Sequence, residues 1–255
     1  MIIEAILTPA ELPALAQRDL RATACVVFDV LRATSTFVTA LHHGATAIIP
    51  VSEIAEALEI KKSEVKSQKP EVILLGGERH GVRISANGID FDLGNSPREY
   101  TPERVLGKTI VSTTTNGTRA LRACAKAPTV LAASFLNLTA TADFLRRNSH
   151  ETILLICAGT GENPADEDII AAGALADALM SGKDTFSKRT ASAIAARSAY
   201  FEAARMGLER KISLAENARR LLAIPELRDD VSFCLQRDIF PLVAEMNAAG
   251  AIRRL

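Results

Sequence analysis

Short runs of apolar, mostly β-branched residues recur along this chain of 255 residues and alternate with longer amphipathic segments. Each run is apolar at consecutive positions, which is typical of strands buried on both faces of a parallel sheet. Strands that alternate with helices predict an α/β fold of three layers, α/β/α, with a mainly parallel sheet in the middle. The predicted strands are Ile2–Leu7, Cys25–Phe28, Ala47–Val51, Val72–Leu75, Thr109–Ser112, Thr129–Ala132 and Ile153–Cys157.

The segments between these runs carry apolar residues at helical spacing, as at Ile54 and Leu58. The predicted helices are Thr34–His43, Ser52–Lys66, Thr118–Ala125, Asn137–Arg147 and Glu167–Met180, followed by Arg189–Met206 and Ser213–Leu222 in a region rich in Ala and Arg. The chain has no internal repeat and no long linker. We therefore expect a single unit over residues 1–255, with a possible subdivision into an α/β core at 1–185 and a helical C-terminal part at 186–255.

Charge and composition argue against two classes of partner. The 30 basic and 30 acidic residues cancel, whereas a nucleic-acid surface normally shows a basic excess. No run of about 18 apolar residues is present, and the N-terminus lacks the pattern of a secretory leader. The four cysteines are far apart and lie in apolar runs, which favours buried, reduced thiols. We expect a cytoplasmic protein that binds neither nucleic acid nor membrane.

Polar clusters follow the predicted strands, where ligands bind in an open parallel sheet. The first cluster, residues 29–36, places Asp29 where a carboxylate could hold a metal and Arg32 where a planar guanidinium could bind phosphate or sulfonate. Thr34 or Ser35 could cap the next helix, whose N-terminal amides favour an anion. The structural alternative is an ion pair between Asp29 and Arg32, with the hydroxyls serving only as caps.

A second cluster follows the predicted strand that ends at residue 75. Gly76 and Gly77 would let the backbone approach a ligand closely, and Glu78 and Arg79 repeat the combination of a metal ligand with an anion-binding group. His80 is a candidate acid or base. A tight turn followed by an exposed charge pair is the structural alternative.

The third cluster, residues 91–97, lies in a long stretch between predicted elements. Asp92 is a candidate metal ligand, and Asn95 and Ser96 are candidate substrate-binding residues. Long connections without regular structure are usually functional or disordered. The same residue types also suit an ordinary Asx-type turn.

The fourth cluster follows a strand and opens a helix, so its amides and hydroxyls could form an anion-binding nest. Three consecutive threonines before Asn-Gly are more than a turn requires, although a capped turn is the structural alternative. The candidate substrate-binding residues are Thr113, Thr114, Thr115, Asn116, Gly117 and Thr118.

The fifth cluster is the Gly-rich end of the strand at 153–157 and the acidic helix start that follows it. Gly159 is a candidate for backbone contact with the substrate, and Asp168 is a candidate magnesium ligand. Acidic residues in a first helical turn are otherwise normal partners of the helix dipole.

Taken together, the five clusters resemble the 2-phosphosulfolactate phosphatase family of coenzyme M biosynthesis. The matching stretches are DVLRATST at 29–36, LLGGER at 74–79, FDLGNSP at 91–97, TTTNGTRAL at 113–121, SFLN at 134–137, CAGTG at 157–161 with ED at 167–168, and RDDVSFC at 228–234. The resemblance covers nearly the whole chain. It implies a magnesium-dependent phosphomonoesterase with a family-specific α/β/α fold that releases sulfolactate and phosphate, and it suggests a homodimer.

With this resemblance, Asp29 together with Glu78, Asp92 or Asp168 would hold Mg²⁺, which prefers oxygen ligands and keeps several waters. Arg32, Arg79 and the 113–118 loop would neutralise phosphate, sulfonate and developing charge. The attacking group could be a metal-bound water or Asp29 itself. Two other functions stay open, namely a phosphatase for another small phosphorylated hydroxy acid and a non-catalytic anion-binding module.

Overall fold

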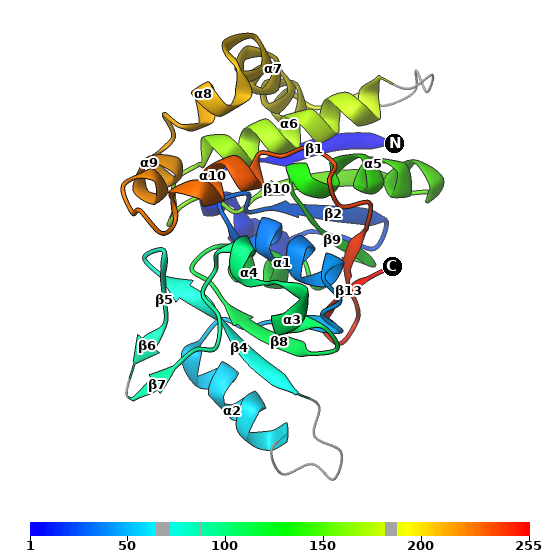
Figure 1. The fold of residues 1–255 in the computed structure, drawn as a ribbon. Helices are drawn as coiled ribbons and strands as arrows, with labels where there is room; N and C mark the ends of the chain where they lie inside the picture. The colour runs from blue at the N-terminus through cyan, green and yellow to red at the C-terminus, as the bar shows by residue number, and fades with distance from the viewer. Residues whose placement is uncertain (65–71, 87, 182–187) are drawn as a thin grey trace.

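The computed structural model describes residues 1–64, 72–86, 88–181 and 188–255 and shows a large sheet between layers of helices (Figure 1). The seven predicted strands are confirmed. The strands are β1 (Ile2–Ile6), β2 (Thr23–Phe28), β3 (Ala47–Pro50), β4 (Ile73–Arg79), β5 (Val82–Arg83), β6 (Ser85–Ala86), β7 (Ile89–Asp90), β8 (Thr109–Thr113), β9 (Thr129–Ala133), β10 (Thr152–Cys157), β11 (Lys188–Arg189), β12 (Ala244–Met246) and β13 (Ile252–Arg254).

The helices also follow the predicted order, although the predicted helix at 213–222 begins three residues later, at Glu216. The α-helices are α1 (Ala33–His42), α2 (Ile54–Glu64), α3 (Pro102–Val105), α4 (Gly117–Ala123), α5 (Leu138–Arg147), α6 (Asp166–Met180), α7 (Ala191–Met206), α8 (Leu208–Ile212), α9 (Glu216–Leu222) and α10 (Arg228–Cys234), and the 3₁₀ helices are η1 (Pro9–Gln17), η2 (Pro97–Glu99) and η3 (Phe135–Asn137). The end of the predicted helix at residues 65–66 and the predicted boundary at 185–186 lie outside the described residues.

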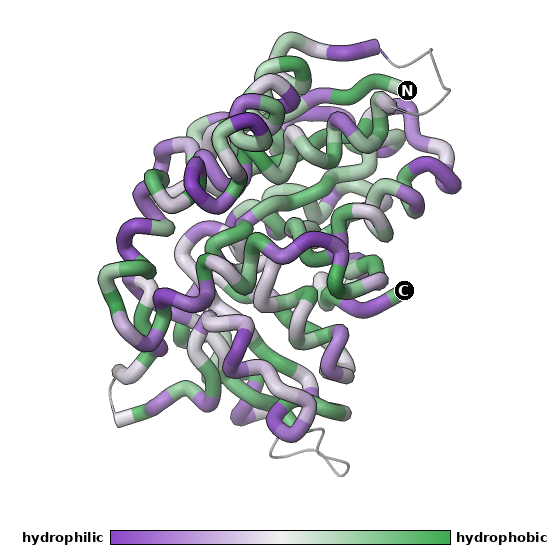
Figure 2. The backbone as a smooth tube through the Cα atoms, turned by 45° about the horizontal axis from the view of Figure 1, so that its top comes forward, coloured by the Kyte–Doolittle hydropathy of each residue, from purple (hydrophilic) through white to green (hydrophobic). Residues whose placement is uncertain are grey.

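The three predicted layers are confirmed by the two cores on either side of the sheet. In β2, Val26 and Phe28 belong to the core beneath α5, α6 and α7, whereas Cys25 and Val27 belong to the core beneath α1 and α4. Both faces of β2 are therefore buried, and this is why its sequence is apolar at every position. Figure 2 shows that the inner strands are mostly hydrophobic, whereas the outer helices alternate between hydrophilic and hydrophobic residues.

An antiparallel hairpin of β12 and β13 occupies the middle of the sheet, between β9 and β3. It joins two parallel groups, β1–β10–β2–β9 and β3–β8–β4, which therefore run in opposite directions within the sheet. Neighbouring strands rotate by about 20–25°, so the six steps from β2 to β4 turn the strand direction by about 120–150°. The opposite directions of the two strand groups and the twist between them together bring the carboxyl ends of β2 and β4 to one cavity.

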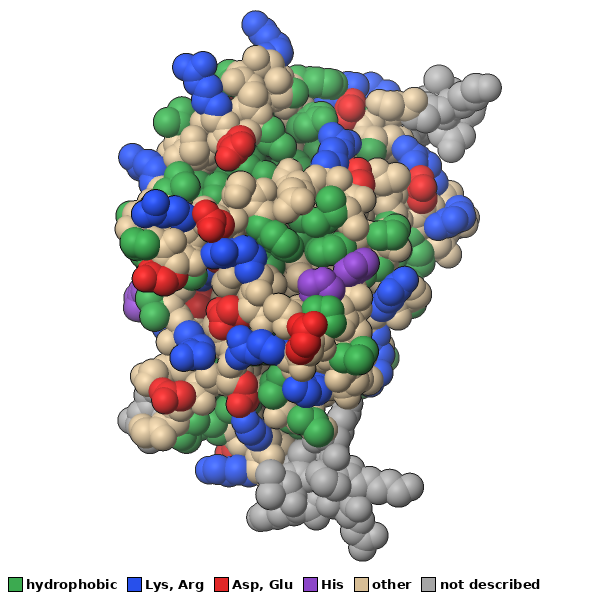
Figure 3. Space-filling model, viewed as in Figure 1, with side chains coloured by type: hydrophobic (Ala, Val, Ile, Leu, Met, Phe, Trp, Pro, Cys, Tyr) green, Lys and Arg blue, Asp and Glu red, His purple; other side chains and the backbone are tan. Residues whose placement is uncertain are grey.

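The described surface mixes charges of both signs. On the face shown in Figure 3, acidic and basic side chains are interspersed over α2, α9 and α10. The four cysteines are buried and free in the described part of the chain, as the sequence predicts. Within the described ranges, no helix is both long and apolar enough to span a bilayer.

Gly173 allows α6 and α7 to pack closely. A Cβ atom at this position would overlap the carbonyl oxygen of Ala196 in α7. Gly→Ala inside a helix normally stabilises by about 0.5–1 kcal/mol, but overpacking of a close contact costs about 1–3 kcal/mol. We expect Gly173→Ala to lower the free energy of unfolding by about 1–2 kcal/mol in urea titrations, as a balance of these two effects. An unchanged or higher stability would contradict this packing.

Candidate active site

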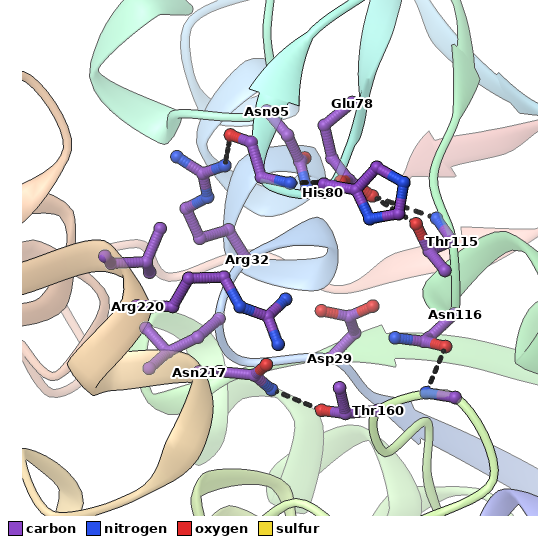
Figure 4. A pocket seen from close by; sticks show the side chains of 14 residues that line it. Asp29, Arg32, Glu78, His80, Asn95, Thr115, Asn116, Thr160, Asn217 and Arg220 are labelled. Atoms are coloured by element: carbon purple, nitrogen blue, oxygen red, sulfur yellow. Dashed lines mark hydrogen bonds between the residues drawn. The ribbon is translucent and has the colours of Figure 1, made fainter. Parts of the chain in front are cut away.

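A cavity opens where β2, β4, β8 and β10 end, and α9, from the C-terminal part of the chain, closes one side of it (Figure 4). Its volume of about 220 Å³ is below the 300–1,000 Å³ of drug-sized sites, so it suits a small ligand. The described residues that line it are Asp29, Leu31, Arg32, Glu78, His80, Gly81, Asn95, Thr115, Asn116, Thr160, Gly161, Asn217, Arg220 and Leu221. Seven of the candidate residues from the sequence are among them, namely Asp29, Arg32, Glu78, His80, Asn95, Thr115 and Asn116.

Asp29 follows β2 and is held by backbone amides. Its Oδ1 atom accepts a hydrogen bond of 3.0 Å from the amide of Ala33, and the amide of Gly117 also donates to the carboxylate. The side chain is nevertheless buried, and burial raises the pKa of Asp29 to about 7, with Glu78 and Glu167 adding like charge. A carboxyl group with such a pKa at the wall of a cavity is typical of a functional site.

Glu78 stands at the other side of the same cavity and is positioned by the 113–118 loop. Its Oε1 atom accepts hydrogen bonds from the amide and the hydroxyl of Thr115, at 2.9 and 3.0 Å. Its Oε2 atom accepts a hydrogen bond of 2.7 Å from the amide of Gly81. Three donors therefore hold this largely buried carboxylate in one orientation.

Arg32 lines the cavity but is already paired within the protein. Its Nη1 atom donates to Asp230 at 2.7 Å, and its Nη2 atom donates to the carbonyl oxygen of Gly81 at 2.6 Å. Asp230 is fully buried and also accepts hydrogen bonds from Ser96 and Arg98. The structural alternative of an Asp29–Arg32 ion pair is therefore wrong, because the carboxylate that pairs with Arg32 belongs to α10.

Arg79 and Thr113, two further candidates, are not among the residues lining the cavity. The Nη2 atom of Arg79 donates to the hydroxyl of Thr113 at 3.0 Å, and this hydroxyl donates to the carbonyl oxygen of Ser52 at 3.1 Å. Both side chains thus fasten the ends of β4 and β8 to the segment after β3.

Asp92 and Asp168 were candidate metal ligands, and neither is among the described residues lining the cavity. Asp92 pairs with Lys61 at 2.7 Å and accepts the amide of Leu75 at 2.8 Å. Asp168 is buried and accepts the amides of Val30 and Gly159, at 2.8 and 3.0 Å. Burial raises the pKa of Asp168 strongly, and Glu167 and Asp29 add to the shift. Asp168 therefore links the ends of β2 and β10 directly behind Asp29.

Gly76 and Gly77 lie inside β4, which corrects the predicted strand end at residue 75. A side chain at Gly76 would overlap the hydroxyl of Tyr100, and one at Gly77 would overlap the carbonyl oxygen of Thr113. Gly77 also has φ +151°, which favours glycine. Close strand packing, rather than contact with the cavity, is what requires these two glycines.

The remaining candidates shape the loops around the cavity. The Thr34 hydroxyl bonds the backbone of Asp29, and the Ser35 hydroxyl donates to Val30. A Cβ atom at Gly117 would lie 2.6 Å from Oδ2 of Asp29, so glycine is required for the two loops to meet. The Thr118 hydroxyl donates to the carbonyl oxygen of Thr114, and the Ser96 hydroxyl donates to Asp230. Gly159 has a positive φ of 64°, which favours glycine in this loop.

Several lining residues are not among the candidates named from the sequence. Asn217 and Arg220 come from α9, and Thr160 follows β10. The Nδ2 atom of Asn217 donates to Thr160 and to Glu167, both at 2.7 Å, whereas Oε2 of Glu167 is buried without a hydrogen-bond partner among the described residues. The sequence predicts a helix at 213–222 but gives no indication of which helical face meets the cavity.

A family model described as 2-phosphosulpholactate phosphatase matches residues 7–249. The chain belongs to this family. A protein named probable 2-phosphosulfolactate phosphatase from Caldanaerobacter subterraneus subsp. tengcongensis is 39% identical over 232 residues, which cover 90% of each chain. Proteins of the same name from Thermotoga petrophila (42% over 220 residues, 86% of each chain) and Clostridium perfringens strain SM101 (38% over 228 residues, 89% of this chain and 87% of the relative) are also similar. These matches confirm the resemblance seen in the motifs.

In this member of the phosphatase family, the donor set at the cavity suits a hard cation that keeps waters of its own. Asp29 and Glu78 supply two carboxylates, and Oδ1 of Asn95 is buried without a hydrogen-bond partner among the described residues. No group of three His, Cys, Asp or Glu side chains in the described ranges is arranged to hold a metal. Two carboxylates with neutral oxygens fit Mg²⁺, whereas a closed zinc site needs four protein ligands.

The buried pair of Arg32 and Asp230 predicts a large loss of stability when the acid is neutralised. Asp230→Asn leaves the Arg32 guanidinium buried without a counter-charge, and breaking such a pair costs about 3–5 kcal/mol. We expect that decrease in the free energy of unfolding measured with urea. Asp229→Asn is the matched control, because Asp229 is exposed and its contact with Arg98 is 3.4 Å long. Equal effects of the two changes would contradict the assignment.

Proposed function

We propose that this chain is a magnesium-dependent phosphatase that hydrolyses 2-phospho-3-sulfolactate to 3-sulfolactate and phosphate. The observation that carries the proposal is the meeting of two buried carboxylates, Asp29 and Glu78, at the wall of one small polar cavity. Membership of the 2-phosphosulpholactate phosphatase family and the names of its relatives support the choice of substrate.

The two carboxylates cannot bind a phosphate ester by themselves, because like charges repel. A Mg²⁺ ion held by Asp29 and Glu78, when bound, would polarise the phosphoryl oxygens and activate water. The side-chain amide of Asn116, which also lines the cavity, would help to orient the ester, whereas the donors of Thr115 hold Glu78. The carboxylate oxygens of Asp29 and Glu78 can hold the cation, and a cation beside this amide makes the cavity suitable for a phosphate monoester.

Asp29 has two possible roles in the proposed reaction, as a ligand of the cation and as the attacking group. Its pKa of about 7 means that burial opposes the charged form, so a neighbouring cation would favour the carboxylate. Its fixed contacts with Ala33 and Gly117 keep the carboxyl group at the cavity wall in either role.

We also propose the domain organisation, the cellular compartment, the pathway and the oligomeric state of the enzyme. Strands from both ends of the chain share one sheet, which supports a single unit over residues 1–255. Buried, free cysteines in the described part of the chain fit a reducing, cytoplasmic compartment. A role in coenzyme M biosynthesis and a homodimeric state rest on the family resemblance.

Asp29→Asn tests the site directly. We expect phosphate release from 2-phospho-3-sulfolactate in the presence of Mg²⁺ to fall by about 10³-fold or more, since a charged group that acts in the transition state is lost. Asp166→Asn is the control, because Asp166 is an exposed carboxylate at the start of α6 and does not line the cavity. Turnover of Asp29→Asn at the wild-type rate would remove Asp29 from the chemistry.

Removal of the metal tests the cofactor. We expect phosphate release to stop in excess EDTA and to return when Mg²⁺ is added beyond the chelator. Mg²⁺ should also raise the thermal midpoint of the wild-type protein, because a ligand that binds only the folded state stabilises it. This shift should vanish in the double variant Asp29→Asn, Glu78→Gln. Full activity in EDTA would exclude a metal-dependent mechanism.

A further inference from the structure

Of the two arginines among the described residues that line the cavity, Arg220 is the one whose donors remain available to a ligand. Arg32 also lines the cavity, but Asp230 and Gly81 already engage both of its terminal nitrogens. Within the described residues, the partner of Arg220 is Glu216, at 3.2 Å from Nη2, and the Glu216 side chain is 70% exposed. Such an exposed pair contributes little, so its guanidinium can turn to an anion with little loss.

The position of α9 directs Arg220 into the cavity. Ala218 and Leu221 are buried and anchor one side of this short helix. Asn217 and Arg220, three positions apart, share the side that faces the cavity. Asn217 is fixed by its bonds to Thr160 and Glu167. Figure 4 shows the Arg220 guanidinium pointing into the cavity between Asn217 and Arg32, with Asp29 opposite.

The proposed substrate carries a phosphate, a carboxylate and a sulfonate, and these groups differ as ligands. Phosphate and carboxylate oxygens bind hard cations well, so a cation between Asp29 and Glu78 can hold both. A sulfonate is the conjugate base of a strong acid and a weak metal ligand, so it needs hydrogen-bond donors. The planar fork of arginine matches the oxygens of such a tetrahedral anion.

We propose that Arg220 binds the sulfonate group of the substrate and thereby sets the selectivity of the enzyme for a sulfonated phosphoester. This assignment rests on the proposed function of the cavity. It makes α9 the part of the chain that distinguishes substrates, whereas the strand ends carry the residues for the phosphoryl group.

The test compares Arg220→Met with Arg219→Met, a change of the neighbouring exposed arginine on the same helix that does not line the cavity. Each variant is assayed on 2-phospho-3-sulfolactate and on 2-phospholactate, which lacks only the sulfonate. A charged hydrogen-bonded pair supports a loss of about 10–100-fold, so we expect kcat/KM of Arg220→Met for the sulfonated substrate to fall by that factor, mainly through KM. For 2-phospholactate the change should stay below about threefold, and Arg220→Lys should lie between wild type and Arg220→Met.

Two results would overturn the assignment. Equal losses on both substrates would place Arg220 at the phosphate or the carboxylate, and unchanged kinetics would remove it from substrate binding. Calorimetric titration with 3-sulfolactate in the presence of Mg²⁺ separates this assignment from the proposed function. The wild type could bind 3-sulfolactate more tightly than Arg220→Met does and yet hydrolyse neither phosphoester. That result would support the sulfonate site and contradict the proposed phosphatase activity. Failure of the wild type to bind 3-sulfolactate would reject the site.

Discussion

The antiparallel hairpin of β12 and β13 is the constraint on which the arrangement of the site depends. It lies between β9 and β3, so the last residues of the chain join the two parallel strand groups. The groups run in opposite directions within the sheet, and only the accumulated twist turns their carboxyl ends toward each other. Asp29 after β2 and Glu78 in β4 therefore share a cavity although six strand steps separate their strands.

A second long-range link attaches the C-terminal helices to this cavity. Asp230 of α10 is buried and accepts hydrogen bonds from Arg32 and Ser96, which belong to two different loops. The full burial of Asp230 requires compensation by these donors, because an unpaired charge in the interior would be very unfavourable. The helices that follow residue 188 thus contribute both the counter-charge that holds the Arg32 loop and the side chains of α9 that close the cavity.

Charge is distributed unevenly within the cavity. Asp29 and Glu78 both line the cavity, with Glu167 and Asp168 buried behind Asp29, and the raised pKa of Asp29 reflects first its burial and then the like charge of Glu78 and Glu167. A cation is the natural complement of these two carboxyl groups, whereas Arg220 offers positive charge from α9. A substrate with several anionic groups could therefore be divided between a metal and an arginine, which is the basis of both proposals.

The sequence by itself determined the three layers, the order of strands and helices, and the family, because buried parallel strands require continuous apolar runs and the motifs are unusual strings. It also indicated Asp29, Glu78, Thr115 and Asn116 as residues after predicted strands, and Asn95 as a residue of the long stretch between predicted elements. Tertiary structure alone decided which polar side chains are free to meet a ligand. Arg32 pairs with a residue 198 positions away, and Asp92 pairs with Lys61. Arg220 reaches the cavity only because α9 packs across it, and no local pattern encodes such a contact.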